Sequence, residues 1–278
     1  MQIVFSTQIS VFLTLNHAMA QKRPLILVTN DDGITAPGIR TLIKAVLPLG
    51  EVVVVAPDAP QSGMGHAITV NDTLYCDPIK VDDSLEISEF SCSGTPADCV
   101  KIAVNEVLHR KPDLLVSGVN HGSNASINVI YSGTMSAAVE AGTMGIPAIG
   151  FSLLDFSYNA DFSHTIDPIR HLTRQCLEHG MPQGVVLNVN FPKIDNGPFK
   201  GIKICRQANA QWVEQFDKRK SPWGRTYYWL SGEFVNLDQG QDTDQWALDN
   251  GYISVVPVQY DLTAHYAIPL INQWNLNS

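Results

Sequence analysis

Short apolar runs rich in β-branched residues alternate with helical patterns through residue 191, and this alternation limits the possible folds more than any other feature. The run Leu25–Val28 is followed by a helical pattern in which Ile39 and Leu42 share one face. Four consecutive valines then occupy positions 52–55, which is typical of a strand buried on both faces. Repeated strand–helix units indicate an α/β fold with a parallel sheet between two layers of helices.

The same alternation predicts the later elements of this part of the chain. We expect further strands at 114–116, 146–151 and 185–191, and further helices at 97–109, 134–144 and 166–180. In an open parallel sheet, ligands bind in the crevice beyond the carboxyl ends of the strands. Polar residues that directly follow a strand are therefore the first candidates for a functional site.

Past residue 200 the pattern changes. Strands are expected at 201–205 and 252–258, and the stretch between them is rich in Trp, Tyr, Gly, Asp and Gln without a helical period. We expect hairpins or long loops there, forming an arm for oligomerisation. Aromatic residues of this stretch, such as Trp212, also have the chemistry to stack on a base, although packing in an interface is the favoured explanation. The chain is therefore divided into an extension at 1–20, a core at 21–200 and a hairpin-rich segment at 201–278.

The first residues carry a weak targeting signal. Residues 11–15 are apolar and residues 18–20 read Ala-Met-Ala, an arrangement that resembles a signal peptide, but no Lys or Arg precedes them. Because Met19 offers a natural start, we favour a mis-called start upstream and a cytoplasmic protein. The location is periplasmic only if residues 1–20 are a genuine signal. No other apolar run is long enough to span a membrane.

Charge and cysteine content exclude several classes of function. The formal net charge of the 278 residues is −9, whereas binding to a nucleic-acid polymer needs a basic surface. The five cysteines are odd in number and contain no Cys-x-x-Cys, so a disulfide framework or structural zinc site is not expected. An acidic protein that takes an anionic substrate needs a local positive charge, which a bound cation can supply.

Oxygen-bearing side chains gather where the predicted strands end. Asp31 and Asp32 follow the first strand, Ser62 lies in the loop after the second, and Asn120 follows the strand at 114–116. Two carboxylates, a hydroxyl and an amide carbonyl are ligands for a hard cation such as Mg²⁺ or Mn²⁺ rather than for zinc or copper. A cation would also relieve the repulsion between the adjacent aspartates. Taken alone, each group has a simpler explanation, because Asp-Asp-Gly is usually a turn or a helix cap.

Glycines and helix starts near these groups are suited to phosphate. Gly63 and Gly118 allow the backbone to approach a ligand closely. The start Ser132-Gly133-Thr134 of a predicted helix offers free N–H groups and the positive end of a helix dipole, although a plain helix cap is an equally good explanation. Residues 93–96, before the helix at 97–109, have the same potential.

Five ordered segments resemble the SurE family of stationary-phase survival 5'-nucleotidases, over residues 24 to about 265. They are LVTNDDGITAPGI, VVAPDAPQSGMGHAIT, SGTPADCV, PDLLVSGVNHGSNASINVIYSGTMSAAVEA and DNGYISVVPVQYDLTAH. The resemblance implies a Rossmann-like, three-layer α/β/α core with a mostly parallel sheet. It also implies a C-terminal β-hairpin arm that is exchanged between subunits, giving a homodimer or homotetramer. The implied activity is hydrolysis of nucleoside monophosphates by a phosphoric monoester hydrolase with one divalent cation.

The resemblance also assigns roles to residues of this chain. It implies that the metal ligands are Asp31, Asp32, Ser62 and Asn120, and that the two aspartates are catalytic, as base or as nucleophile. It places Tyr131 to Thr134 near the phosphate and makes Asn30 a support for the two carboxylates. Together with the glycines and the strand-end serine, the expected phosphate- and substrate-binding residues are Asn30, Gly63, Ser117, Gly118, Ser132, Gly133 and Thr134. The extension at 1–20 departs from the family pattern and bears on location rather than on the site.

The same residues are compared with the requirements of two other functions. A haloacid-dehalogenase-type phosphatase forms an aspartyl phosphate and needs Asp-x-Asp after the first strand, whereas here Asp31 and Asp32 are adjacent. A non-catalytic nucleotide- or NAD-binding module lacks support because no Gly-x-Gly-x-x-Gly follows that strand.

Overall fold

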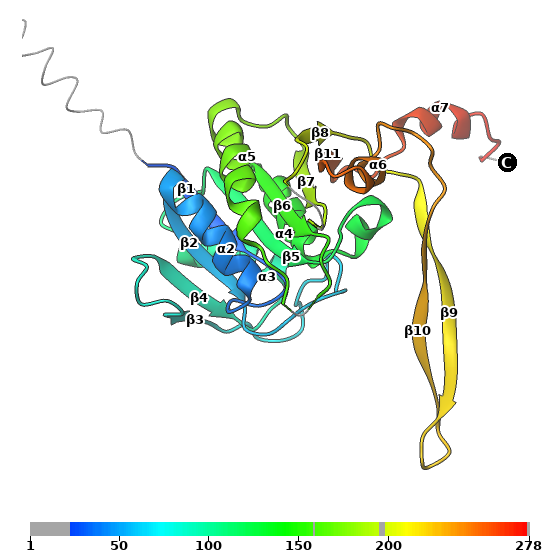
Figure 1. The fold of residues 1–278 in the computed structure, drawn as a ribbon, viewed down its shortest axis with the longest axis horizontal. Helices are drawn as coiled ribbons and strands as arrows, with labels where there is room; N and C mark the ends of the chain where they lie inside the picture. The colour runs from blue at the N-terminus through cyan, green and yellow to red at the C-terminus, as the bar shows by residue number, and fades with distance from the viewer. Residues whose placement is uncertain (1–22, 158, 195–197, 277–278) are drawn as a thin grey trace, which may run out of the picture.

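The computed structural model describes residues 23–157, 159–194 and 198–276 (Figure 1). The extension at 1–20 lies outside these residues, so the predictions of a mis-called start or a signal peptide are not addressed by the structure.

A mostly parallel sheet forms the middle layer of the molecule. Within the described residues it has nine strands, in the order β3-β4-β2-β1-β5-β6-β7-β11-β8. The parallel strands at its centre are β4 (Ser88–Cys92), β2 (Glu51–Pro57), β1 (Leu25–Thr29), β5 (Leu114–His121), β6 (Ala148–Leu153) and β7 (Val185–Phe191). At the two edges, β3 (Cys76–Ile79) is antiparallel to β4, β11 (Ile253–Gln259) is antiparallel to β7, and β8 (Ile202–Ile204) is parallel to β11.

Helices cover both faces of this sheet, which confirms the three-layer α/β/α prediction. On one face lie α2 (Pro37–Val46) and α5 (Ile166–His179), and on the other lie α3 (Pro96–Ile102) and α4 (Gly133–Thr143). The shorter helical segments are η1 (Leu47–Leu49), η2 (Ala103–Val107), η3 (Ser126–Tyr131), η4 (Ser163–Thr165), α6 (Asp244–Asp249), η5 (His265–Ala267) and α7 (Ile268–Ile271).

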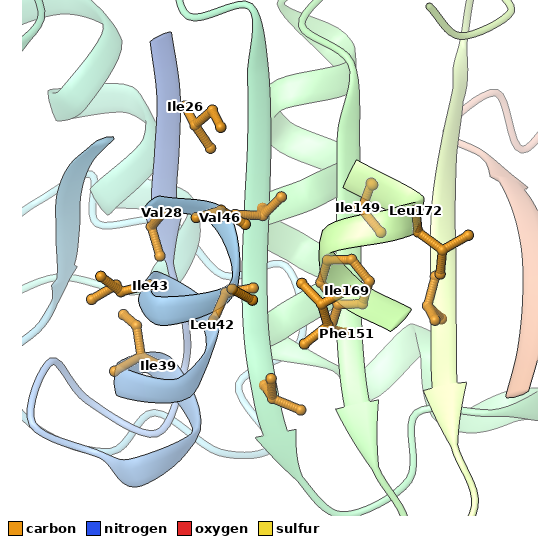
Figure 2. Packing of buried hydrophobic residues seen from close by; sticks show 14 of the residues in the cluster. Ile26, Val28, Ile39, Leu42, Ile43, Val46, Ile149, Phe151, Ile169 and Leu172 are labelled. Carbon is orange, nitrogen blue, oxygen red and sulfur yellow. The ribbon is translucent and has the colours of Figure 1, made fainter. Parts of the chain in front are cut away.

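The first four residues of β1 show why the central strands begin with continuous apolar runs. Ile26 and Val28 point to the face covered by α2 and α5, whereas Leu25 and Leu27 point to the opposite face. Because successive side chains of a strand alternate between faces, a strand that is covered on both faces buries every side chain. Apolar residues are therefore favoured at consecutive positions of such a strand. Figure 2 shows the first of these layers, where Ile39 and its neighbours on α2 meet the side chains of the strands. Each fully buried Leu, Ile or Val contributes about 1.5–3 kcal/mol relative to an exposed one.

A long hairpin leaves the core and forms the expected C-terminal arm (Figure 1). Its strands, β9 (Ala210–Lys220) and β10 (Thr226–Asn236), pair with each other in a separate two-stranded sheet. Most of the arm is exposed, including the large apolar side chains Trp212, Phe216, Trp223, Tyr228, Trp229 and Leu230. An isolated two-stranded ribbon is marginally stable in water, so this surface favours contact with a partner.

Several elements differ from the sequence predictions. The strand expected at 114–116 continues to His121, because β5 lies between β1 and β6 and pairs with both. Strands β3 and β4 and the short helix α6 were missed. Helix α6 spans six residues, too few for a helical period, and is defined instead by the Thr243 side chain, which accepts a hydrogen bond from the N–H of Trp246. The segment after residue 200 supplies β8 and β11 to the main sheet as well as the arm, and the division of the chain at 200 stays a prediction.

Candidate metal and phosphate site

The predicted site residues lie where the connectivity of the sheet changes direction. From β1 the chain moves to β2 on one side, and β5 later pairs with the other side of β1. This is the position at which open α/β sheets form a ligand crevice. Thr29 and Ser117 are paired in register, so the residues that follow β1 lie beside the end of β5.

Asp31 is buried and held by the start of α4. It is 3% exposed, and its Oδ1 accepts a hydrogen bond of 2.6 Å from the Thr134 hydroxyl. Gly133 packs against the same carboxyl group, since a Cβ at that position would lie 2.7 Å from Cβ and 2.9 Å from Oδ2 of Asp31. Only glycine therefore allows α4 to begin this close to the carboxylate.

Asp32 is partly exposed and is held from the opposite side. Its Oδ2 accepts a hydrogen bond of 3.1 Å from the backbone N–H of His121, the last residue of β5. The two carboxylates are thus fixed by different elements, Asp31 by α4 and Asp32 by β5. Neither donor is an obvious feature of the sequence, because Thr134 and the His121 backbone are far from the aspartates along the chain.

Both aspartates are held in an environment that disfavours their charge. Burial, followed by repulsion from Asp32, raises the pKa of Asp31 to about 6, against the opposing hydrogen bond from Thr134. Burial also raises the pKa of Asp32, while the backbone N–H of His121 and then the charge of the His121 ring oppose the shift. Among the residues described, no Lys, Arg or His forms an ion pair with either carboxylate. The described residues therefore give the pair no ion-pair partner, and the charge of the His121 ring acts on Asp32 only as the smallest of the three influences on its pKa.

The loop after β2 is fastened beside this pair. The N–H of Gln61 donates to the backbone oxygen of Asp31 at 2.7 Å, and the N–H of Gly65 donates to the backbone oxygen of Tyr131 at 3.2 Å. Ser62 and Gly63 lie between these two anchors and are exposed. The structure therefore holds the Ser62 loop against the residue that carries the first carboxylate.

Asn120 completes the oxygen set from β5. The side chain is 9% exposed, and its Nδ2 donates to the backbone oxygen of Gly122 at 2.9 Å, which leaves Oδ1 available as a ligand. Gly118, two residues earlier, has a φ of +122°, and a Cβ there would lie 2.2 Å from the backbone oxygen of Phe151. A side chain at 118 would thus displace the strand end that carries Asn120.

Buried polar atoms without partners surround the strand ends. Asn30 donates from Nδ2 to the backbone oxygen of Gly33 at 2.9 Å, but its Oδ1 is buried and unpaired, as are the hydroxyls of Thr29 and Ser117. Such groups are rare in folded proteins and call for an explanation such as a bound ion or water. The unpaired atoms of Asn30 and Ser117 lie next to the acid pair along their strands, and their role in binding stays a prediction.

The two candidate helix starts differ in how they are used. Ser132 caps α4, since its side chain accepts a hydrogen bond from the N–H of Met135, while Thr134 faces Asp31. At the start of α3, Thr95 and Asp98 form a capping box. The carboxylate of Asp98 also accepts from Thr69, so this second helix start is occupied by its own side chains. Of the two, only the start of α4 lies at the acid pair.

The donor set fits a hard divalent cation. The two adjacent carboxylates, a hydroxyl and an amide oxygen come from three separate loops or strand ends, and in the described part of the chain the carboxylates form no ion pair. No group of three or more His, Cys, Asp and Glu side chains suited to a metal occurs in the described part of the chain. The proposed site does not meet this description, because only two of its four side chains are acidic and the other two are neutral oxygen donors.

The fold and this cluster define an α/β protein with an acidic, oxygen-lined site at the switch point of a mostly parallel sheet. Residues 26–214 match the family model described as Survival protein SurE, and the chain belongs to the SurE family. Among the residues described, no helix combines the length and apolar character required to cross a bilayer.

Relatives named 5'-nucleotidase SurE match almost the whole chain. The chain is 67% identical to 5'-nucleotidase SurE of Christiangramia forsetii over 93% of its own length and 100% of the relative. It is 66% identical to 5'-nucleotidase SurE of Flavobacterium psychrophilum, over 92% and 99% of the two chains. The crystal structure of the SurE protein from Aquifex aeolicus matches with a TM-score of 0.77 at 38% identity, covering 90% of this chain and 98% of that one.

Proposed function

We propose that this protein is a divalent-metal-dependent 5'-nucleotidase that hydrolyses nucleoside 5'-monophosphates to a nucleoside and phosphate. The observation that carries the proposal is the pair Asp31 and Asp32, fixed at the switch point with raised pKa values and without an ion-pair partner among the described residues. Membership of the SurE family and the names of its relatives support the nucleotidase activity.

The proposed metal ligands are Asp31, Asp32, Ser62 and Asn120. One cation, Mg²⁺ or Mn²⁺, would supply Lewis-acid polarisation of the phosphate ester. The residues of the chain fix the geometry around it: Thr134 orients one carboxylate, and the N–H of His121 orients the other. Such hydrogen bonds to ligating carboxylates set their direction and basicity.

The proposed phosphate-binding residues surround the acid pair. Gly133 and Thr134 begin α4, whose N-terminus favours an anion, while Gly63 and Gly118 let the backbone come close. The remaining members of this set are Asn30, Ser117 and Ser132. Together they would hold the three non-bridging oxygens while a water molecule attacks in line with the ester oxygen.

The two catalytic aspartates have different settings. Asp31 is enclosed by the start of α4, whereas Asp32 is more exposed and closer to solvent. We infer that Asp31 is chiefly an anchor and that Asp32 takes the proton of the attacking water. A covalent role for Asp32 is the competing mechanism, and it would leave a phosphorylated aspartate during turnover.

Assembly and location follow from the same proposal. The exposed aromatic residues of β9 and β10 support a homodimer or homotetramer built through the arm. We propose a cytoplasmic enzyme that needs neither a nucleic-acid polymer nor a membrane.

The direct test is Asp32→Asn, with Mn²⁺ binding and phosphate release from AMP measured separately. We expect weaker Mn²⁺ binding and a loss of rate of about 100- to 10,000-fold, because both the ligand charge and the proton acceptor are removed. Asp58→Asn is the matched control, since Asp58 is an exposed aspartate in the same strand-end region. Full activity of Asp32→Asn would contradict the assignment.

A further inference from the structure

A cavity of about 560 Å³ lies between the candidate site and the arm. Gly63 of the loop after β2 and Tyr131 at the end of η3 form one side. Trp212, Glu214 and residues 230–232 of the arm form the other. The volume is in the range of pockets that hold small organic ligands.

This cavity adjoins the proposed phosphate site. Gly63 directly follows Ser62, a proposed metal ligand, and Tyr131 directly precedes Ser132, a proposed phosphate-binding residue. The ester group of a bound monophosphate must extend away from the phosphate. The cavity provides a space for that group next to the phosphate-binding residues.

Two aromatic rings line the cavity with their surfaces partly open. Tyr131 is 53% exposed and Trp212 is 45% exposed, so both have ring surface free for contact. Trp212 is held in place, because its Nε1 donates to Oδ1 of Asn128 at 2.8 Å and its ring meets the ring of Phe234 edge-on at 5.6 Å between centroids. A fixed aromatic side chain beside a phosphate site is suited to stacking on a nucleobase.

The arm also presents a carboxylate to this cavity. Glu214 pairs with Gly232 in the register of β9 and β10, and Trp212 lies two residues earlier on the same face of the ribbon. Gly232 has no side chain to cover the carboxylate. Within the described residues, Glu214 takes part in no ion pair or hydrogen bond of its side chain.

We propose that this cavity binds the base of the nucleotide and that Glu214 favours guanine, an inference that rests on the proposed nucleotidase function. A carboxylate only accepts hydrogen bonds. Guanine presents two neighbouring donors, N1–H and the 2-amino group, on one edge. Adenine presents an acceptor, N1, beside its amino group, so it satisfies a carboxylate less well. Trp212 and Tyr131 provide the stacking surface for either purine.

A second cavity, of about 610 Å³, is lined by Ser132 itself and is the competing location for the base. It is lined mostly by aliphatic side chains, and Gln207 is among its polar residues. Arg206 also lines this second cavity, but its guanidinium group is already bound by Asp238 and Asp242. Gln207→Ala therefore serves as the matched variant for this alternative.

The test compares substrates with and without a base. The full-length protein with Mn²⁺ is assayed on GMP, AMP and ribose 5-phosphate, which keeps the sugar phosphate and lacks the base. Glu214→Gln is expected to lower the ratio of kcat/KM for GMP to that for ribose 5-phosphate about tenfold, and the corresponding AMP ratio by much less. Trp212→Ala is expected to lower both nucleotide ratios about tenfold. Trp223→Ala, at the exposed end of the same arm, is the control for effects of the arm alone.

The outcomes separate this proposal from the one on which it rests. If the wild-type protein releases phosphate from none of the three substrates, the proposed nucleotidase function is wrong. The base site is then tested by calorimetry, which compares the binding of GMP with that of ribose 5-phosphate in the wild type and in the same variants. Unchanged ratios, or unchanged binding preferences, in Glu214→Gln and Trp212→Ala overturn the base site. A loss of base preference in Gln207→Ala alone also overturns it, because the base then lies in the second cavity.

Discussion

Two clusters of aspartates in this protein have opposite electrostatics. Asp31 and Asp32 lie at the end of β1, where burial raises the pKa of both and the described residues form no ion pair with them. Asp238 and Asp242 lie at the base of the arm and share Arg206, with hydrogen bonds of 2.6 to 2.9 Å. The hydrogen bonds from Arg206 lower the pKa of both of these carboxyl groups.

The difference shows which cluster requires an external partner. Arg206 binds both aspartates in an exposed setting, where water screens the one negative charge that is left over, so that cluster needs no further partner. The acid pair at the sheet edge has only neutral donors, Thr134 and the backbone of His121. An ionised pair in such a place is costly unless a cation joins it. The same reasoning indicates that the site is kept at the expense of stability, as functional sites often are.

The largest expected effect comes from removing the charge of Asp31. We expect Asp31→Asn to lower phosphate release by about 1,000-fold and to raise the stability of the metal-free protein at pH 8. A pKa raised from 3.8 to about 6 means that the folded state keeps its proton where the unfolded chain has lost it. Stability from this group is therefore highest at low pH and falls as the pH rises through about 6, by roughly 3 kcal/mol in all.

Thermal unfolding in EDTA at pH 4 and pH 8 checks this prediction. The stabilising effect of Asp31→Asn should be present at pH 8 and nearly absent at pH 4. If Asp31→Asn is less stable than the wild type at pH 8, the ionised acid pair does not lower the stability of the folded protein and the prediction is wrong.

A smaller loss is expected from Gly133→Ala. The added Cβ would meet Asp31 at 2.7 Å, so α4 or the carboxylate must shift. A displacement of this kind at a reacting site lowers rates by about 100-fold. Steady-state kinetics with Mn²⁺ measure the loss, and far-UV circular dichroism confirms the fold. The control is Ala138→Gly, which changes another residue of α4. Gly224→Ala is unsuitable as a control, because Gly224 has a φ of +77° and an alanine there would be strained. Activity near that of the wild type would contradict close packing at this point.

A pH-dependent effect of about tenfold is expected from Thr134→Val. The variant keeps the shape of the side chain but removes the hydroxyl that donates to Asp31, so the pKa of Asp31 rises further. Protons then compete better with Mn²⁺. The affinity for Mn²⁺, measured by titration, should fall about tenfold at pH 6 and clearly less at pH 8. An equal loss at both pH values would indicate that Thr134 acts on shape alone.

The smallest effect is expected at the other cluster. Asp242→Asn removes one exposed partner of Arg206, while Asp238 keeps two hydrogen bonds to it. Exposed ion pairs contribute little, so Tm should change by less than about 3 °C and should not change at all in 1 M salt. A change in stability as large as the one expected for Asp31→Asn would show that the two clusters of aspartates do not differ in this way.

Much of the fold was predictable because the strands are buried on both faces. Continuous apolar runs such as Leu25–Val28 and residues 52–55 have few alternatives to a central strand. Strand β3 and helix α6 were missed because β3 is an exposed edge strand and α6 is too short for a period. The extension of β5 to His121 depends on pairing with β6, which continues past Ser117 after a shift in register and which the polar sequence of this segment does not reveal.

By itself, the sequence determined the layered α/β architecture and the gathering of oxygen ligands at one edge of the sheet. Both follow from local rules, since periodicity sets each element and parallel strands end on the same side. Only the tertiary structure decided that the start of α4, and not that of α3, meets Asp31, across 103 positions of the chain. It also brought Trp212 and Glu214 of the arm to the same cavity as Tyr131. Such contacts depend on how separate elements pack, and no local pattern in the sequence records that packing.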